Sequence, residues 1–152
     1  MNTADVKFMQ LALAQAKKAG QIGEVPVGAV LVSENGAILA TTHNETIKLT
    51  DPTAHAEILA LRQAALKINN YRLLNTTLYV TVEPCIMCMG AIVHARISDV
   101  VFGTNDPKWG AAGSLYNFAE DDRLNHLIDI KSGVCEEDCR KLMKDFFCAK
   151  RA

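Results

Sequence analysis

Residues 77–95, TLYVTVEPCIMCMGAIVHA, have the pattern of an apolar strand that continues directly into a short apolar helix. The β-branched and aromatic residues of the first half favour a strand, and the apolar run of the second half favours a helix. Pro84 separates them and commonly opens a helix, which predicts Cys85 and Cys88 in the first helical turn. A strand that ends at such side chains is typical of an α/β sheet, which binds ligands at that edge.

Helical and strand patterns alternate along the rest of the chain, without repeats or linkers. The strongest short hairpin signal, Asn35-Gly36, joins two of the expected strands. We expect helices over 4–19 (with Gly20 as its stop), 54–67, 86–95 and 136–149, and strands over 27–33, 37–42, 77–82, 100–102 and 127–131. This order predicts an α/β fold in which helices cover both faces of a central sheet, within a single domain over residues 1–152.

Three side chains form a candidate zinc site, namely His55, Cys85 and Cys88. One nitrogen and two sulfur donors suit a tetrahedral zinc ion, and three protein ligands leave a fourth position for water, as in catalytic sites. With Thr53 as the N-cap, His55 falls in the first turn of its helix. Helix N-termini also lower thiol pKa values and favour the thiolates that zinc needs.

Glu57 lies two residues after His55 and is not needed as a ligand. Residues two apart do not share a helix face, so Glu57 must approach a zinc-bound water from another direction than the ligand. A zinc-bound hydroxide would attack an amidine-like ring carbon, while Glu57 moves protons to a ring nitrogen and to the departing amine. The order H-x-E followed by P-C-x-x-C matches the signature of zinc-dependent nucleobase deaminases.

Composition sets modest bounds. The 152 residues are 49% hydrophobic and 22% charged, which is ordinary for a globular domain. No apolar stretch is long enough to cross a bilayer, and the first seven residues lack a signal-peptide pattern. An odd number of cysteines, five, favours a reducing cytoplasm over a disulfide framework. The chemistry described above needs no redox cofactor, and the sequence contains no GxGxxG or GxxxxGK(S/T) phosphate-binding loop.

The net charge of −1 does not indicate a protein that holds nucleic acid over its whole surface. The most basic segment is the C-terminus, where Asp145 is the only acidic residue from residue 140 onward, against Arg140, Lys141, Lys144, Lys150 and Arg151. Two interpretations stay open at this point. The basic side chains complement the dipole of a last helix and solvate its outer face, or they form a local RNA-binding patch.

Five segments carry a wider similarity, over nearly the whole chain: PVGAV (26–30), DPTAHAE (51–57), TVEPCIMC (81–88), VFG (101–103) and GAAGSL (110–115). In them the chain resembles the bacterial tRNA-specific adenosine deaminase family. The resemblance implies a three-layer α/β/α, cytidine deaminase-like fold with a mixed sheet of about five strands. It implies a homodimeric hydrolase, with one zinc per subunit, that converts the wobble adenosine of a tRNA anticodon to inosine. His55, Cys85 and Cys88 are then the ligands, and Glu57 is the proton shuttle.

The resemblance also implies contacts with the RNA. Asn44, after the second strand, is expected to hydrogen-bond the target nucleotide, and the loop around Asp106 and Lys108 to contact the backbone beside the flipped base. The segment 145–147 and the basic residues after it resemble an RNA-facing C-terminal helix. The expected substrate-binding residues are Asn44, Ala56, Glu83, Asp106, Lys108 and Phe147.

Simpler roles remain open for the metal-binding residue types. The alternative for the zinc site is a structural zinc with a further cysteine as its fourth ligand. Cys135 and Cys139 are expected to be reduced thiols, with a second metal pair as the alternative. His94 and His126 are assigned no role.

The apolar and polar candidates also have simpler alternatives. Asn44 alone would be expected to end a strand in a turn. Phe146 and Phe147 are by default core anchors. The apolar stripe of the third helix is expected to belong to the core or to a subunit interface, and it consists of Ile86, Met87, Met89 and Ile92.

Two other functions stay open besides tRNA deamination. The near-neutral charge favours a free-base or nucleoside deaminase of the same fold, acting on guanine or cytosine, whereas the loop 110–115 and the C-terminal segment favour tRNA. A non-catalytic zinc-stabilised RNA-binding module is the other. Glu57 separates the enzymes from the module, because only an enzyme needs this carboxylate for turnover.

Overall fold

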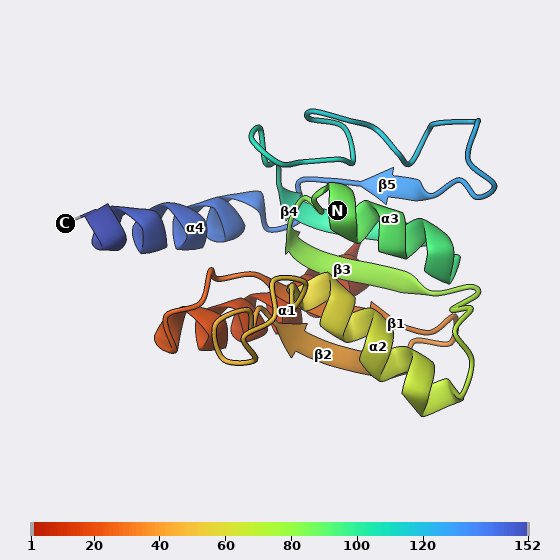
Figure 1. The fold of residues 1–152 in the computed structure, drawn as a ribbon, viewed down its shortest axis with the longest axis horizontal. Helices are drawn as coiled ribbons and strands as arrows, with labels where there is room; N and C mark the ends of the chain where they lie inside the picture. Colours follow the sequence, from red (N-terminus) through yellow and green to blue (C-terminus); the bar gives the residue numbers. More distant parts are fainter. Residues whose placement is uncertain (1, 152) are drawn as a thin grey trace.

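The computed structural model describes residues 2–151, in which five strands form one sheet in the order β2-β1-β3-β4-β5 (Figure 1). Strand β1 is antiparallel to both of its neighbours, whereas β3, β4 and β5 run parallel. The sheet is therefore mixed, as predicted. The strands span Gly28–Val32 (β1), Ile38–His43 (β2), Thr77–Val82 (β3), Asp99–Thr104 (β4) and Asp129–Lys131 (β5).

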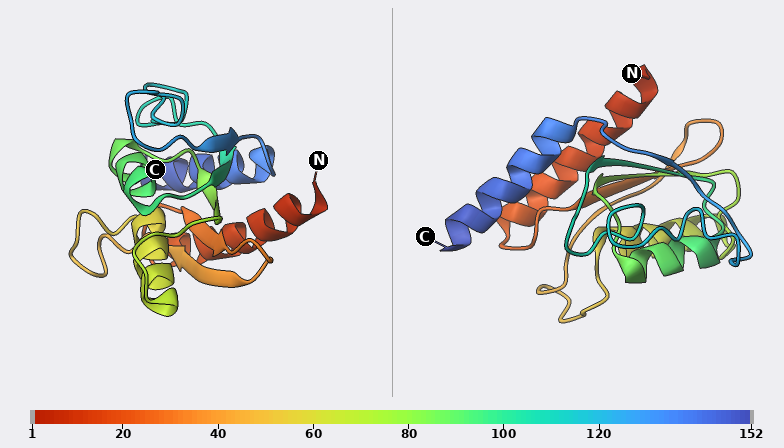
Figure 2. Two further views of the ribbon diagram at one scale, coloured as in Figure 1. Left: turned by 90° about the vertical axis from the view of Figure 1, so that its right-hand side faces the viewer. Right: turned by 90° about the horizontal axis from the view of Figure 1, so that it is seen from above.

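The helices form a layer on each face of the sheet. Helices α1 and α4 lie side by side on one face, and α2 and α3 on the other, which confirms the three-layer prediction (Figure 2). Their bounds are Thr3–Gln21 (α1), Ala56–Ile68 (α2), Ile86–Ala95 (α3) and Glu136–Arg151 (α4). Within residues 2–151, none of these helices combines the length and the apolar character that crossing a bilayer requires.

Alternating side chains of the strands fill two separate cores. In β1, Ala29 and Leu31 point into the core beneath α2 and α3, whereas Val30 and Val32 point into the core beneath α1 and α4. This alternation follows from the two-residue period of a strand. Both faces of β1 are buried, which explains its continuous apolar run.

Two expected helix ends differ from the structure. The first helix passes through Gly20 to Gln21, and the left-handed turn lies at Gly23, with φ +82°. Thr53 is not the N-cap of α2. Its backbone N–H and hydroxyl both bond the Asp51 carboxylate in a turn, and the helix begins three residues later with His55 as its N-cap.

The sheet topology brings the candidate site residues to one edge. Because β1 is antiparallel to both β2 and β3, the strands β2, β3 and β4 all point the same way. Asn44, Glu83 and Asn105 directly follow these three strands, and helices α2 and α3 begin at the same edge. Polar side chains that are distant in sequence thereby meet beside two helix N-termini.

A buried carboxylate joins α1 to the sheet and gives a prediction for stability. Asp5 accepts a hydrogen bond from the Tyr79 hydroxyl (2.8 Å) and pairs with the Lys131 ammonium (2.6 Å). Replacing Asp5 with Ala leaves the buried hydroxyl without its partner, so we expect a loss of about 1–3 kcal/mol in the free energy of unfolding. Chemical denaturation measures it. The loss should shrink when Tyr79 is already Phe, and an unchanged loss in that background would contradict the proposed coupling.

Candidate metal centre and active site

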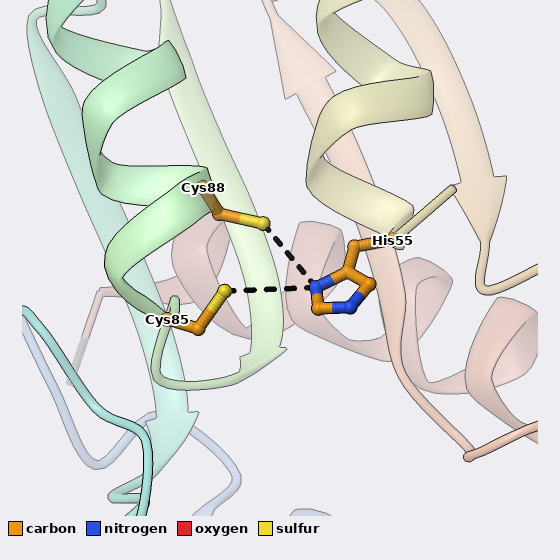
Figure 3. A group of neighbouring side chains, drawn as sticks. All are labelled: His55, Cys85 and Cys88. Atoms are coloured by element: carbon orange, nitrogen blue, oxygen red, sulfur yellow. Dashed lines mark hydrogen bonds between the residues drawn. The ribbon is translucent and has the colours of Figure 1, made fainter. Parts of the chain in front are cut away.

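His55, Cys85 and Cys88 converge between the starts of α2 and α3 (Figure 3). The Nδ1 atom of His55 lies 3.7 Å from the Cys85 sulfur and 3.5 Å from the Cys88 sulfur. Both sulfurs come from α3 and point at the imidazole, because Cys85 is the N-cap of that helix and Cys88 lies in its first turn. The predicted placement is thus confirmed for Cys88, and Cys85 lies one residue before the helix.

These separations fit a zinc ion. Zinc lies about 2.3 Å from sulfur and about 2.0–2.1 Å from nitrogen, and at a tetrahedral angle this places sulfur and nitrogen about 3.6 Å apart. The observed 3.5 and 3.7 Å bracket that value. The donor types and their spacing therefore match three corners of a zinc tetrahedron.

The three donors shift one another's pKa values. A hydrogen bond from the Cys88 thiol lowers the pKa of Cys85 to about 4. The same bond and burial raise the pKa of Cys88. The hydrogen bond with Cys85 also raises the pKa of His55.

Glu57 is buried at the second position of α2, with 4% of its surface exposed. Burial raises the pKa of this carboxyl to about 7. His55 has an extended backbone (φ −71°, ψ 153°) and precedes the helix. His55 is therefore outside the helix. The rule that residues two apart in one helix lie on different faces does not apply to His55 and Glu57. Among residues 2–151, the metal-competent cluster does not include Glu57.

The structure does not support the alternative of a closed structural zinc site. Within the part of the chain described, no further cysteine or histidine joins the three donors. Cys139 is buried beneath the sheet, and burial raises its pKa to about 12, while burial also raises the pKa of Cys135. Both are protonated thiols near neutral pH. An open position beside a buried carboxyl is the arrangement of a catalytic centre.

A cavity of about 970 Å³ opens over the donors. Strand ends, the loop after β4 and one side of α4 form its walls. The basic residues of α4 that line it are Arg140, Lys144 and Arg151. These side chains line the cavity and are also exposed to solvent, so both interpretations of the basic segment remain open.

The loop after β4 is held in place by the Glu83 carboxylate, which is 3% exposed. It accepts bonds from the backbone N–H groups of Asp106, Ala112 and Ser114, each at 3.0 Å, and from the Ser114 hydroxyl. Four donors occupy the acceptor positions of one carboxylate. The structure assigns Glu83 the role of a loop anchor, and its direct contact with substrate remains a prediction.

Asn44 and Ala56 are likewise joined by the fold. The Asn44 side-chain oxygen accepts the Ala56 N–H at 2.8 Å, so Asn44 caps α2 from outside the helix. Asn44 also lines the cavity, whereas Ala56 is fully buried. Contact of either residue with substrate stays a prediction.

Glu24 is a structural residue of the site region that the sequence did not reveal. It is 1% exposed, and its carboxylate accepts the Ile47 and Lys48 N–H groups and the Thr46 hydroxyl, which fixes the loop before Pro52 at the cavity wall. Its partners are more than 20 positions away and offer backbone groups, so no local pattern marks them.

Of the remaining candidate residues, some line the cavity and others are buried in the core. Asp106, Lys108 and Phe147 line the cavity, and Phe147 is 39% exposed, so it is not a core anchor. In the apolar stripe of α3, Met89 and Ile92 are buried and Ile86 is exposed at the cavity. The sequence also gave no sign that Trp109 lines the cavity mouth.

A substitution at Gly110 tests whether activity depends on the position of the loop after β4. A Cβ on Gly110 would overlap the Glu83 carboxyl, and Gly110 pairs with Cys85 in an isolated bridge. Gly110→Ala should therefore displace the loop and lower kcat/KM by roughly 10- to 100-fold, with zinc retained. Steady-state kinetics and zinc content measure both effects. Gly20→Ala is the control, because its methyl group meets only Pro26, at 3.6 Å. Wild-type kinetics for Gly110→Ala would show that the loop position does not matter.

Comparison with known proteins gives consistent similarities. The model of the cytidine and deoxycytidylate deaminase zinc-binding region matches residues 2–104. The tRNA-specific adenosine deaminase of Haemophilus influenzae is 52% identical over 97% of this chain and 85% of that protein. That of Bacillus subtilis is 46% identical over 95% and 89%, respectively. A solved structure from a study of A-to-I editing by tRNA:A34 deaminases at the wobble position of transfer RNA has a TM-score of 0.86 at 43% identity, covering 90% of this chain and 98% of that chain.

Proposed function

The chain belongs to the cytidine and deoxycytidylate deaminase family, and on that premise we propose that it hydrolyses adenosine to inosine at the wobble position of a tRNA anticodon. The observation that carries the chemistry is the buried Glu57 carboxyl beside three zinc donors with an open position. The tRNA substrate rests on the relatives, which match nearly the whole chain and are named tRNA-specific adenosine deaminases.

The reaction needs a proton shuttle, and Glu57 fills that role. His55, Cys85 and Cys88 would hold the zinc ion, which would supply the Lewis acidity that lowers the pKa of the attacking water. Glu57 takes the proton of the attacking water and delivers it to the ring nitrogen N1. The water oxygen bonds to C6, and the bond between C6 and the exocyclic amine nitrogen breaks. Glu57 gives the second proton of the water to this departing amine. Adenosine and water thus become inosine and ammonia.

The cavity suits a nucleotide within a strand. Its volume, about 970 Å³, lies at the upper end of small-molecule sites, and cationic side chains extend it along α4. A flipped base would enter between Asn44 and the zinc donors, while Lys108 and Lys144 meet the flanking phosphates. Asp106 and Phe147 are proposed to contact the neighbouring nucleotides. The unpaired bases of an anticodon loop make such extrusion inexpensive.

We further propose a homodimer in a reducing cytoplasm. Helices α2 and α3 present a shallow groove to the outside, lined by Ile58, Leu61, Met87 and Ala91 among others. Its other lining residues are Thr53 and Arg62, and a groove lined mainly by apolar side chains suits burial against a second copy. Sedimentation velocity of the zinc-loaded protein tests the dimer, and the absence of a dimer at micromolar concentration would exclude it.

The test of function uses zinc-loaded protein and an anticodon stem-loop with adenosine at the wobble position. Sequencing reads inosine as guanosine, and we expect conversion confined to that adenosine. A stem-loop with adenosine elsewhere in the loop is the control. Ammonia release from guanine, cytosine or free nucleosides, without conversion of the RNA, would show that the substrate is a small molecule and not tRNA. Inactivity on every substrate would favour a non-catalytic zinc-stabilised RNA-binding module.

A further inference from the structure

The only tryptophan of the chain, Trp109, lies at the mouth of the cavity. Its side chain belongs to the loop after β4, and 66% of the residue is exposed. A large aromatic side chain is usually buried, because its apolar surface favours removal from water. Its position at the rim of the cavity makes the indole available to a ligand that enters there.

The backbone around Trp109 is held firmly. Its N–H donates to the Asp106 carboxylate at 3.2 Å, and the Gly110 N–H donates to the Asp106 carbonyl at 2.8 Å. Asp106 is in turn bonded to the buried Glu83, and Ala111 donates to the Pro84 carbonyl beside the zinc ligands. The backbone of Trp109 is thus held by the same hydrogen-bond network that borders the metal donors. An exposed ring on a fixed backbone loses little conformational entropy when a ligand covers it.

The charges of the cavity that Trp109 lines indicate which class of ligand would contact the indole. Lys108 precedes it, and Lys144 of α4 lines the same cavity. Within residues 2–151, neither ammonium group forms an ion pair with a carboxylate. Cations without a carboxylate partner, in a cavity that an exposed aromatic side chain also lines, suit a single-stranded nucleic acid, in which phosphates meet the cations and bases stack on the ring.

We propose that Trp109 is a stacking platform for an unpaired base that neighbours the deaminated adenosine. This inference rests on the proposed function and adds a substrate-binding residue to it. Stacking outside the reacting centre holds the strand while the target base is turned into the cavity. It also makes the enzyme sensitive to the nucleotide next to the target, because purines stack more extensively than pyrimidines.

The first test uses the fluorescence of Trp109 itself, which reports on this position alone. Zinc-loaded Glu57→Gln protein, which cannot consume the RNA, is titrated with the anticodon stem-loop. We expect the emission to be quenched with the same midpoint as binding of a labelled RNA followed by anisotropy. Saturated binding without any change in the emission would overturn the proposal, and this measurement requires no substitution of Trp109.

Substitutions of Trp109 then distinguish the effect of the aromatic ring from the effect of side-chain size. Trp109→Leu should weaken RNA binding by roughly 5- to 150-fold, the range measured for the loss of one stacked base. Trp109→Phe keeps a ring and should restore most of the affinity. In the active enzyme the Leu variant should lose kcat/KM mainly through a higher KM. Equal affinity of the Leu variant and the wild type would contradict stacking, as would equal losses in the Leu and Phe variants.

Abasic RNAs identify the stacked base. Stem-loops lacking the base on the 5′ or the 3′ side of the adenosine are bound to the wild type and to Trp109→Leu. We expect one abasic RNA to lose affinity for the wild type but to bind both proteins equally, as coupled sites require. Independent, additive losses for both RNAs would overturn the proposal. Inosine formation without coupling would leave the proposed function intact, whereas failure of the wild type to bind or convert RNA would overturn both.

Discussion

Glu57→Gln is expected to retain zinc and to lose inosine formation by about 10²–10⁴-fold, the contribution of a general acid–base group. The amide has nearly the shape of the carboxylate, and it can neither take the proton of the attacking water nor deliver it to N1. Glu57 is 4% exposed, and it is the carboxyl placed beside the metal donors in the proposed mechanism. The three metal donors are unchanged, and so metal affinity should remain near that of the wild type.

Single-turnover conversion of the stem-loop, with enzyme in excess over RNA, measures the chemical step without product release. Zinc per chain and thermal unfolding are recorded on the same samples. Glu34→Gln is a matched control, because this exposed glutamate lies in the β1–β2 connection at the opposite edge of the sheet. A rate for Glu57→Gln within about threefold of the wild type would remove the carboxyl from the mechanism, since its expected contribution is at least 10²-fold.

The elements that the sequence predicted best are those with strong local patterns. The strand 77–82 and the helix 86–95 have the predicted bounds, because apolar periodicity and Pro84 mark them. The Asn35-Gly36 hairpin is confirmed, and Gly36 has φ +86°. The start of α2 was misplaced because Thr53, a good N-cap residue, is engaged by Asp51. A competing local hydrogen bond thus outweighed cap preference.

The candidate site was predictable where its chemistry is carried by residue type and spacing. His55, Cys85 and Cys88 meet as expected, since two helix starts share one sheet edge. Contacts between distant segments were not predictable. The Glu83 carboxylate accepts hydrogen bonds from backbone N–H groups 23 to 31 positions away. Nearly every residue has such a group, so no residue type in the sequence marks these partners. The exposure of Trp109 likewise depends on the path of a loop that tertiary contacts fix.

Cys88→Ala is expected to abolish zinc binding and to reduce inosine formation to background. Cys88 is fully buried and its sulfur lies 3.5 Å from His55 Nδ1, and within residues 2–151 the donor cluster contains only His55, Cys85 and Cys88. Two donors, His55 and Cys85, would remain, fewer than the three protein ligands of catalytic zinc sites. Zinc that binds only the native state also stabilises it, in proportion to the logarithm of its concentration over Kd. The variant should therefore also unfold at a lower temperature.

Thermal unfolding with and without a chelator separates loss of metal from loss of packing. The chelator should lower the Tm of the wild type and leave that of Cys88→Ala unchanged, because the variant has no zinc to lose. Cys139→Ala is matched in burial, at 1% exposed, and lies outside the donor cluster. It should lose some packing energy while keeping its zinc, its response to the chelator and its activity. A Cys88→Ala protein with full zinc content would show that the metal is held by other residues, and the open-site mechanism would fail with it.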